Sequence, residues 1–364
     1  MVEYAKYELK NVCSRLSSGK SISSKMISEE GRYPVYGGNG LRGYTDHSNF
    51  SGDCAIIGRQ GAFCGNVRYF CGEAYMTEHA VIVCANNLNN THYLAYLLST
   101  MNLGRLSGQS AQPGLSVKTL GIQEIMLPSI EYQNKVVALL SSLDEKIAVN
   151  NNINDNLADL LQTVYQERFG DTSLIANQGI LSDICSYSRD KVAVSELNVS
   201  TYFSTENMLS GKAGSTEATS LPTTSQTTAC HKGDTLISNI RPYFKKIVYC
   251  EDNCGCSTDV LCFTPSQPRY SAYLFSTLYA DKFFAFMVAG SKGTKMPRGD
   301  KQQIMTYPVV LPSEEELAGF NTIASPLLEQ IYSNSAENKR LSILRDTLLP
   351  KLMSGEIDVS AIQL

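Results

Sequence analysis

Apolar side chains recur in alternating steps of four and three residues between positions 136 and 164, with two asparagines among them. This is the heptad spacing of a long helix that packs along a partner helix. Pro128 precedes the stretch and Gly170 follows it, as is typical of a helix that begins and ends there. The pattern predicts a helix over about residues 133–169, on the order of 50 Å long. The series is Val136, Leu140, Leu143, Ile147, Asn150, Asn154, Leu157, Leu161 and Val164.

A second series with the same spacing lies near the end of the chain and predicts a second long helix. Ser313 and Glu316 form a capping-box pattern at its start, and Gly355 follows it. Arg345 interrupts the apolar stripe, and we expect Leu344 to take its place beside it. The members are Phe320, Ala324, Leu327, Ile331, Asn334, Asn338, Leu341, Arg345 and Leu348.

Asparagine occupies the same two positions in both series, where apolar residues would stabilise the packing more. Polar residues in such a seam usually specify register at a cost in stability. If the helices pack antiparallel about a pseudo-two-fold axis, Asn150 faces Asn338 and Asn154 faces Asn334. The alternative is that these side chains only face solvent near a helix end. We predict an antiparallel coiled coil in which the asparagines set the register.

The remainder of the chain contains short strand-like runs between Gly, Pro, Asn and Ser turn signals. Two stretches, residues 91–101 and 271–287, are apolar with helical spacing, and each predicts one shorter helix. The sequence therefore predicts mixed α+β globular parts at about residues 1–126 and 173–310. The clearest strand candidates are residues 54–57, 80–84, 235–237 and 260–263.

Several segments occur twice in the same order, which indicates a tandem duplication. Gly52-Asp53 followed by an apolar pair and Arg59 returns as Gly233-Asp234, an apolar pair and Arg241. The duplication predicts four parts: a domain at 1–128, a central long helix at 129–172, a second domain at 173–312, and a distal long helix with a tail at 313–364. The other matches pair residues 9–14 with 181–186, 96–100 with 273–277, and 127–129 with 311–313.

The net charge of −4 and the pI of about 5.7 do not mark the chain as a nucleic-acid binder, so any phosphate-binding surface must be local. The 11 cysteines and the absence of a signal-peptide pattern favour free thiols in a reducing cytoplasm. No apolar stretch approaches the ~20 residues needed to span a bilayer. We expect a soluble, cytoplasmic protein without a membrane partner.

Several further segments resemble the specificity subunit of type I restriction-modification enzymes, and together with the repeat the resemblance covers nearly the whole chain. They are Gly31–Gly40 with Gly43-Tyr44, Ile57-Gly58-Arg59-Gln60-Gly61, Lys232-Gly233-Asp234 through Ile240-Arg241-Pro242, Lys295-Met296-Pro297, and the tail Leu348–Glu356.

The resemblance implies two target-recognition domains, separated by central and distal helices that pair as an antiparallel coiled coil. Each domain would read one half of a bipartite, asymmetric site on double-stranded DNA. The subunit would not be an enzyme; it would position methyltransferase subunits, expected to be two, and in a full complex restriction subunits. S-adenosylmethionine, and ATP with Mg for restriction, would belong to those partners. A coiled-coil scaffold, an S-like protein without a restriction partner, and an enzyme with unrecognised motifs remain alternatives.

Catalytic and metal-binding motifs are not found in the sequence. Amino-methyltransferase tetrapeptides, a Gly-x-Gly-x-x-Gly loop and a phosphate-binding lysine loop are absent. Cys250, Cys254, Cys256 and Cys262 lie close in sequence to His231, but they lack the Cys-x2-Cys pair of common zinc sites, so buried thiols are favoured. We predict no catalytic residue and no metal.

Candidate DNA contacts follow from residue type and position. Arg59 and Arg241 occupy matching positions, and arginine is a frequent reader of guanine and a phosphate ligand, although a structural ion pair is the alternative. Lys245 and Lys246 follow two aromatic residues without a close acidic neighbour in sequence, and a solvated basic face competes with a phosphate clamp there. Glycines near the loop candidates could serve turn geometry alone. The other candidates are Tyr36, Asn39, Arg42, Tyr44, Gln60, Gln109, Gln112, Asn239, Tyr243, Lys292, Lys295 and Arg298.

Overall fold

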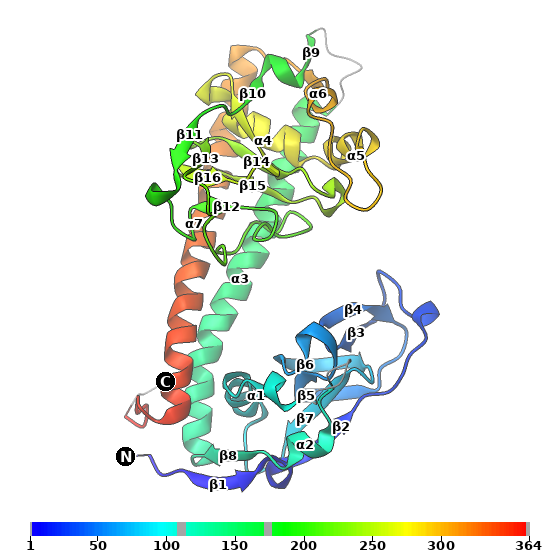
Figure 1. Ribbon diagram of the computed structural model, residues 1–364, viewed down its shortest axis with the longest axis vertical. Helices are drawn as coiled ribbons and strands as arrows, with labels where there is room; N and C mark the ends of the chain where they lie inside the picture. Colours follow the sequence, from blue (N-terminus) through cyan, green and yellow to red (C-terminus); the bar gives the residue numbers. More distant parts are fainter. Residues whose placement is uncertain (1, 108–113, 171–176, 362–364) are drawn as a thin grey trace. The chain divides into compact units, whose positions relative to one another are not determined.

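The computed structural model describes residues 2–107, 114–170 and 177–361 (Figure 1). The chain divides into two compact units. Unit 1 comprises Met1–Ala148 with Asn338–Leu364, and unit 2 comprises Val149–Glu337. Each unit has its own hydrophobic core and its own sheets, and each is described separately below.

Unit 1 is built around a six-stranded sheet in the order β2-β7-β5-β6-β3-β4. The strands are β2 (Cys13–Ser18), β3 (Tyr33–Gly37), β4 (Gly40–Thr45), β5 (Phe50–Gly58), β6 (Val67–Met76) and β7 (Ala80–Ala85). Helix α1 (Thr91–Thr100) packs on β5, β6 and β7, because its buried side chains, Tyr93 and Leu94 among them, meet the apolar face of these strands. The predicted strands at residues 54–57 and 80–84 lie in β5 and β7, which pair with each other.

A two-stranded sheet leads from the rest of unit 1 into the first long helix. Strand β1 (Ala5–Glu8) pairs antiparallel with β8 (Glu124–Leu127), and α3 (Ile130–Phe169) begins after Pro128 and Ser129. The short helix α2 (Val117–Gly121) precedes β8, and Ser116 caps it through the amide of Thr119. The 3-10 turns of this unit are η1 (Leu9–Val12), η2 (Ser24–Met26), η3 (Gly61–Phe63) and η4 (Leu103–Leu106).

Unit 2 contains a four-stranded sheet in the order β10-β17-β14-β15, formed by β10 (Cys185–Tyr187), β14 (Thr235–Ser238), β15 (Ile247–Tyr249) and β17 (Val260–Pro265). A second sheet, β11-β13-β16-β12, joins β11 (Lys191–Ala193), β12 (Tyr202–Phe203), β13 (Gln226–Cys230) and β16 (Cys254–Cys256). The pair β9 (Gln178–Ile180) and β18 (Pro308–Val310) leads into the long helix α7 (Glu314–Ser354). The 3-10 turns of this unit are η5 (Leu181–Asp183), η6 (Val194–Glu196), η7 (Pro242–Phe244) and η8 (Pro268–Tyr270).

The repeated sequence segments lie on matching elements of the two units. The order β2-β7-β5-β6 in unit 1 has the same pattern of antiparallel neighbours as β10-β17-β14-β15 in unit 2. The two shared arginines, Arg59 and Arg241, follow β5 and β14, and the repeated Tyr96 and Tyr273 lie in α1 and α4 (Ser271–Tyr279). Matching pairs of short strands precede α3 and α7. The internal repeat of the sequence thus corresponds to a repeat of strand order.

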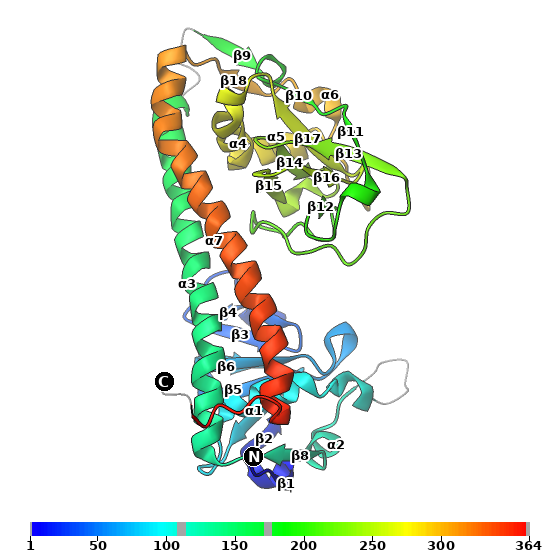
Figure 2. The same ribbon diagram turned by 90° about the vertical axis from the view of Figure 1, so that its left-hand side faces the viewer.

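The long helices agree closely with the sequence prediction. Helix α7 begins with the expected capping box: the Glu316 amide donates to Ser313 Oγ at 3.2 Å, and the Ser313 amide donates to a Glu316 carboxylate oxygen at 2.8 Å. Helix α3 ends at Phe169, directly before Gly170, and α7 ends before Gly355, which has a φ of 75°. Within unit 2 the end of α3 lies beside the start of α7, as Figure 2 shows.

Two expectations about helices are wrong. The predicted helix at residues 271–287 is two helices, α4 and α5 (Asp281–Ala289), because the backbone of Ala280 is extended, with a ψ of 139°. Leu344 does not replace Arg345 in the seam, since Leu344 is 47% exposed while Arg345 points to the partner helix. Among the described residues, we find no helix that combines the length and the apolar character needed to cross a bilayer.

Candidate nucleic-acid interface

In unit 1 the loops at one end of the six-stranded sheet bring several candidate residues together. The turn between β3 and β4 lies against the end of β5, since a Cβ on Gly38 would approach the His79 carbonyl oxygen to 2.8 Å and the Gly58 Cα to 3.3 Å. The amide of Arg59 donates to that same carbonyl at 3.0 Å. Gln60 Oε1 lies 3.1 Å from His79 Nδ1. Arg59 and Gln60 therefore border the hairpin that carries Asn39.

The side chains of the remaining candidates of the hairpin differ in how closely they pack against the rest of the unit. Tyr36 packs against Phe70 with ring centroids 5.1 Å apart, and burial raises the pKa of its phenol, so its ring belongs to the core. The side chain of Arg42 passes over Gly37. Tyr44 is half-buried, and its backbone pairs with Ser28. Gln109 and Gln112 lie outside the described residues.

The structure adds Arg68, on β6, to this group. Its guanidinium carbon would lie 3.2 Å from a Cβ on Gly40, so it rests on the tip of the β3–β4 hairpin, and its side chain is exposed. Nothing in the local sequence marked this arginine, because it lies opposite Ile56 in the pairing of β5 with β6, and the hairpin lies against the end of β5. An exposed arginine on a glycine-rich tip is suited to contact phosphate or a base edge.

In unit 2, Arg241 starts the 3-10 turn η7 and has a φ of 50°, a left-handed conformation that residues other than glycine adopt rarely. Its amide donates to the Pro297 carbonyl at 2.8 Å. The guanidinium makes one long contact, from Nη2 to the Lys295 carbonyl at 3.5 Å, and within the described chain its buried Nε has no hydrogen-bond partner. Arg241 thus retains donors for a further acceptor.

Asn239 lies beneath that loop. It is buried, its amide donates to the Asp259 carbonyl at 2.8 Å, and its own carbonyl accepts from Gly299 at 3.2 Å. A Cβ on Gly299 would lie 2.8 Å from Asn239 Oδ1. The geometry favours a supporting role for Asn239, in which it joins the turn after β14 to the loop before α6 (Lys301–Ile304).

Three of the six basic candidates of unit 2 are paired with acidic residues. Lys245 lacks a close acidic neighbour in sequence, but in the fold its Nζ lies 3.0 Å from Asp281. Lys246 donates to the Thr205 carbonyl at 2.6 Å, and burial lowers the pKa of its ammonium. Lys292 pairs with Asp300 at 2.5 Å and Arg298 with Asp259 at 3.0 Å.

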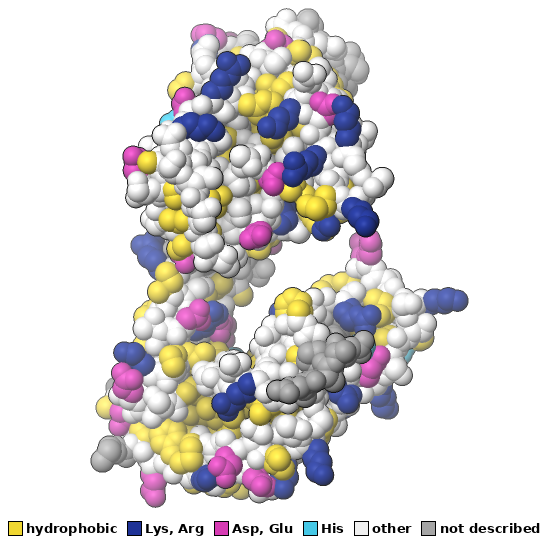
Figure 3. Space-filling view, viewed as in Figure 1, with side chains coloured by type: hydrophobic (Ala, Val, Ile, Leu, Met, Phe, Trp, Pro, Cys, Tyr) yellow, Lys and Arg dark blue, Asp and Glu magenta, His cyan; other side chains and the backbone are white. Residues whose placement is uncertain are grey.

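Lys295 and Tyr243 are exposed at the same loop region. Figure 3 shows the Lys and Arg side chains on the viewed face of unit 2 standing apart from one another, with single acidic side chains and apolar patches between them. Ion pairs on a protein surface contribute little to stability. The paired Lys and Arg side chains can therefore exchange their carboxylate partner for a phosphate at low cost.

Five of the six cysteines of unit 2 form a buried cluster of free thiols, as the sequence spacing favoured. Cys250 Sγ and Cys254 Sγ lie 3.6 Å apart. Hydrogen bonding to neighbouring thiols, together with burial, raises the pKa of the Cys230 and Cys250 thiols above the usual range. Over the described ranges, no group of three His, Cys, Asp or Glu side chains is arranged to hold a metal ion.

In unit 2 the two long helices meet through asparagine side chains. Asn334 Nδ2 donates to Asn154 Oδ1 at 2.8 Å, so the structure brings together one pair that the repeat predicted to face each other. Asn150 is buried and donates to Glu337 Oε2 at 2.7 Å. Asn338, the first residue of α7 that belongs to unit 1, is half-buried. From one contact to the next, the residue number increases along α3, from 150 to 154, and decreases along α7, from 337 to 334. The two helix segments are therefore antiparallel.

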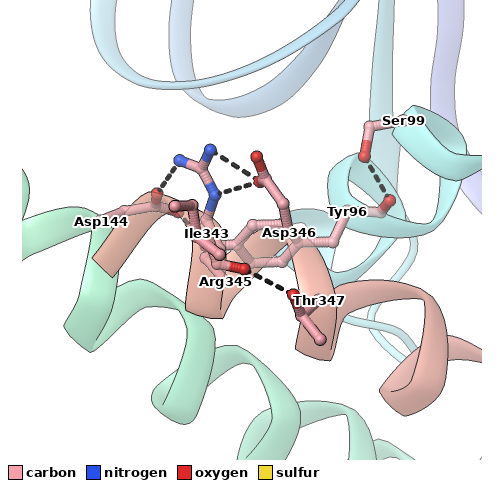
Figure 4. A network of polar contacts seen from close by, with 7 residues as sticks. All are labelled: Tyr96, Ser99, Asp144, Ile343, Arg345, Asp346 and Thr347. Atoms are coloured by element: carbon pink, nitrogen blue, oxygen red, sulfur yellow. Dashed lines mark hydrogen bonds and ion pairs between the residues drawn. The ribbon is translucent and has the colours of Figure 1, made fainter. Parts of the chain in front are cut away.

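In the part of the helix seam that belongs to unit 1, Arg345 occupies a position at which the first copy of the repeat has a leucine, Leu161. Arg345 Nη1 donates to Asp144 Oδ1 at 2.7 Å, and Tyr96 of α1 donates to Asp144 Oδ2 at 2.5 Å (Figure 4). A second carboxylate, Asp346, lies 2.8 Å from Arg345. The network links both long helices to α1. Because its charge is paired there, an arginine can occupy this position of the seam.

Substituting Asn154 by leucine is expected to lower the free energy of unfolding of unit 2 by about 1 kcal/mol, because Asn334 then loses its acceptor in a buried seam. The double substitution with Asn334→Leu is expected to recover most of that loss, since two apolar side chains replace the buried pair and the exposed Gln330, which donates to Asn334 Oδ1, can turn to water. A double-mutant cycle from urea unfolding, followed by hydrogen exchange in α3, measures both. Equal and additive losses in the two single variants would contradict this account.

Comparison with known proteins gives a consistent family likeness. Residues 1–158 match the model of the Type I restriction modification DNA specificity domain. Over 134 residues, 36% of this chain, the sequence is 40% identical to the specificity subunit of the type I restriction enzyme EcoprrI of Escherichia coli. Over 306 residues, 74% of this chain and 69% of the relative, it is 23% identical to the specificity subunit of type I restriction enzyme MjaIX of Methanocaldococcus jannaschii.

The first of these matches spans only 33% of the Escherichia coli protein. Among solved structures, the chain resembles a type I restriction-modification system S subunit from M. genitalium, with a TM-score of 0.62 and 19% sequence identity. That alignment covers 96% of each chain, so it shows that the fold is shared over nearly the full length.

Proposed function

We propose that the whole chain is the DNA-recognition subunit of a type I restriction-modification complex, because residues 1–158 match the model of the DNA specificity domain of such systems. The family match over residues 1–158 carries the proposal. The second unit repeats the strand order of the first, which supports extending the same role to it. The chain would then hold two target-recognition domains, at 1–128 and 173–312, each followed by a long helix, at 129–172 and 313–364.

Each recognition domain reads one half of a bipartite site on double-stranded DNA in this proposal. The framework of the domains is repeated while their loops differ: unit 1 presents a β3–β4 hairpin beside Arg59, and unit 2 presents the turn at Arg241 beside the loop of Lys295. Base edges differ between sequences, so different loops select different half-sites. The whole site is therefore asymmetric.

The two long helices pair as an antiparallel coiled coil and set the separation of the half-sites. The contact of Asn334 with Asn154 and that of Arg345 with Asp144 support this pairing within the separate units. Polar contacts of this kind fix register more than they add stability. We take Asn150, Asn154, Asn334 and Asn338 as the register residues.

Catalysis belongs to partner subunits in the proposed complex. The chain positions methyltransferase subunits, two by the symmetry of the repeat, and a restriction subunit where the host has one. S-adenosylmethionine, and ATP with Mg for restriction, are bound by those partners. The complex acts in the cytoplasm, in defence of the host against foreign DNA.

Single-molecule methylome sequencing of the host, with the gene present and deleted, tests the proposal. We expect one bipartite methylated motif to disappear on deletion and to return when the gene is restored. Salt-dependent retention of the purified chain on duplex DNA, with and without its methyltransferase, separates a DNA reader from a coiled-coil scaffold. Loss of no motif, together with no retention in either setting, would show that the chain does not recognise DNA.

A further inference from the structure

Both units place a short 3-10 turn with exposed aromatic side chains shortly after the repeated arginine. In unit 1 the turn η3 follows Arg59 and Gln60, and Phe63 is 41% exposed. In unit 2 the turn η7 follows Arg241, and Tyr243 and Phe244 are 49% and 38% exposed. Single exposed aromatic groups are common on protein surfaces, so the informative feature is that they recur shortly after the same repeated arginine. The same exposure at matching positions of two diverged units points to a shared use.

The backbone of unit 2 holds these rings at the surface. Arg241 and Lys245, on either side of η7, both have a φ of 50°, where a Cβ is unfavourable. A neighbouring turn at residues 211–212 anchors η7: the Gly211 amide donates to the Phe244 carbonyl at 2.8 Å and the Lys212 amide to the Lys245 carbonyl at 2.9 Å. The turn is thus fixed from both sides, with its two ring centroids 4.7 Å apart. Such conformations are concentrated at functional sites.

Unit 1 achieves a similar turn with glycine. Gly61 and Gly65 have φ values of 75° and 86°, and the Gly65 amide donates to the Gly58 carbonyl at 2.8 Å. A Cβ on Gly65 would lie 2.2 Å from the Gly104 amide nitrogen, so the turn packs tightly on η4. The backbone that carries Phe63 is therefore held in place by its packing on η4.

The surroundings of both turns suit a polyanion. In unit 2, Lys212 and Lys245 share the single carboxylate of Asp281, at 2.7 Å and 3.0 Å, so one positive charge remains after pairing. In unit 1 a hollow of about 590 Å³ begins at Cys64, next to Phe63. The described residues that line this hollow include Arg68 and no carboxylate. Phosphate groups could lie on these rims while the rings face the bases.

We propose that each turn inserts an aromatic side chain between adjacent base pairs, Phe63 in one half-site and Tyr243 or Phe244 in the other. This inference rests on the proposed function. Apolar wedges of this kind unstack a base step and kink the duplex, and the added backbone contacts compensate for the lost stacking. Pyrimidine–purine steps unstack most easily, so the wedge also selects sequence at a step that no hydrogen bond reads.

The test uses the full complex with its methyltransferase subunits and a duplex that carries the motif lost on gene deletion. The duplex contains 2-aminopurine at successive positions through both half-sites, because this base fluoresces more when it is unstacked. We expect a several-fold rise at one step in each half-site. Phe63→Ala should abolish the rise in one half only, and the double variant Tyr243→Ala/Phe244→Ala in the other. Phe63→Leu should retain part of it, since leucine also wedges.

Tyr7→Ala is the matched control, because Tyr7 is an aromatic side chain of unit 1 that is 42% exposed and lies away from η3, on β1. It should leave the fluorescence unchanged. If the complex binds its motif and methylates it, but fluorescence stays quenched at every position, the wedge is wrong while the proposed function stands. A rise that persists in both alanine variants, at a step away from the base that the methyltransferase flips out, has the same meaning. If no motif is lost on gene deletion, the proposed function itself fails, which is a distinguishable result.

Discussion

Replacing Arg241 by alanine is expected to weaken binding of the complex to its DNA motif by roughly 5- to 150-fold, or about 1 to 3 kcal/mol. The reason is the state of its guanidinium in unit 2: the buried Nε has no partner within the described chain, and Nη2 makes only a 3.5 Å contact. A guanidinium with spare donors beside exposed Lys295 is prepared to meet a base edge or a phosphate. Fluorescence anisotropy with the motif duplex measures the loss.

The salt dependence of the same variant separates the two possible ligands of Arg241. A base contact should relax specificity at one position of the motif, whereas a phosphate contact should weaken binding to all sequences and reduce the salt slope by about 1. Arg269→Ala is the control, since Arg269 is also in unit 2 but pairs with Glu314 at 2.7 Å, away from η7. Unchanged affinity in a folded Arg241→Ala complex would exclude Arg241 from the DNA interface.

The sequence predicted those parts of the fold that depend on local periodicity. The heptad series located α3 and α7, and the capping box of Ser313 and Glu316 located the start of α7. These signals are strong because the side chains concerned interact with neighbours one or two turns away, or with one apolar face. The strands β5, β7, β14 and β17 were found for the same reason.

The errors occurred where distant residues decide the local structure. Ala280 is a good helix former, yet it separates α4 from α5, and the Asp281 that follows is held by Lys212 and Lys245. Likewise, Arg345 remains in the seam because Asp144 faces it from α3. Neither partner is visible in a local window of sequence.

The candidate interface shows the same division. Arg59 and Arg241 could be found because the duplication marks them, but Arg68 reaches the hairpin tip through the pairing of β5 with β6. The ion pairs of the basic loops could not be predicted from local sequence either, since Lys245 pairs with Asp281 and Arg298 with Asp259, which are distant in sequence. Sequence reasoning identifies residue types suited to DNA, and the fold decides which of them retain free donors.

Substituting Phe320 by alanine is expected to lower the free energy of unfolding of unit 2 by about 3 to 5 kcal/mol, the largest effect of a single substitution that we predict. Phe320 of α7 is fully buried, and its ring contacts Tyr165 and Phe169 of α3 and Tyr273 of α4, with centroids 5.5 to 6.4 Å apart. Alanine would leave a cavity where both long helices meet the globular part of the unit, and these aromatic neighbours cannot close it without leaving their own contacts.

Ile323→Ala provides the matched control, because Ile323 lies on the same helix but is 37% exposed, and its loss should be a small fraction of that for Phe320. Hydrogen exchange with mass spectrometry resolves the effect by unit: protection should fall in α4, in the end of α3 and in the start of α7, while β5 and β7 of unit 1 keep theirs. Equal loss of protection in both units would mean that the long helices couple them into one cooperative structure. A loss for Phe320→Ala no greater than that for Ile323→Ala would show that the aromatic cluster does not hold the helices to the domain.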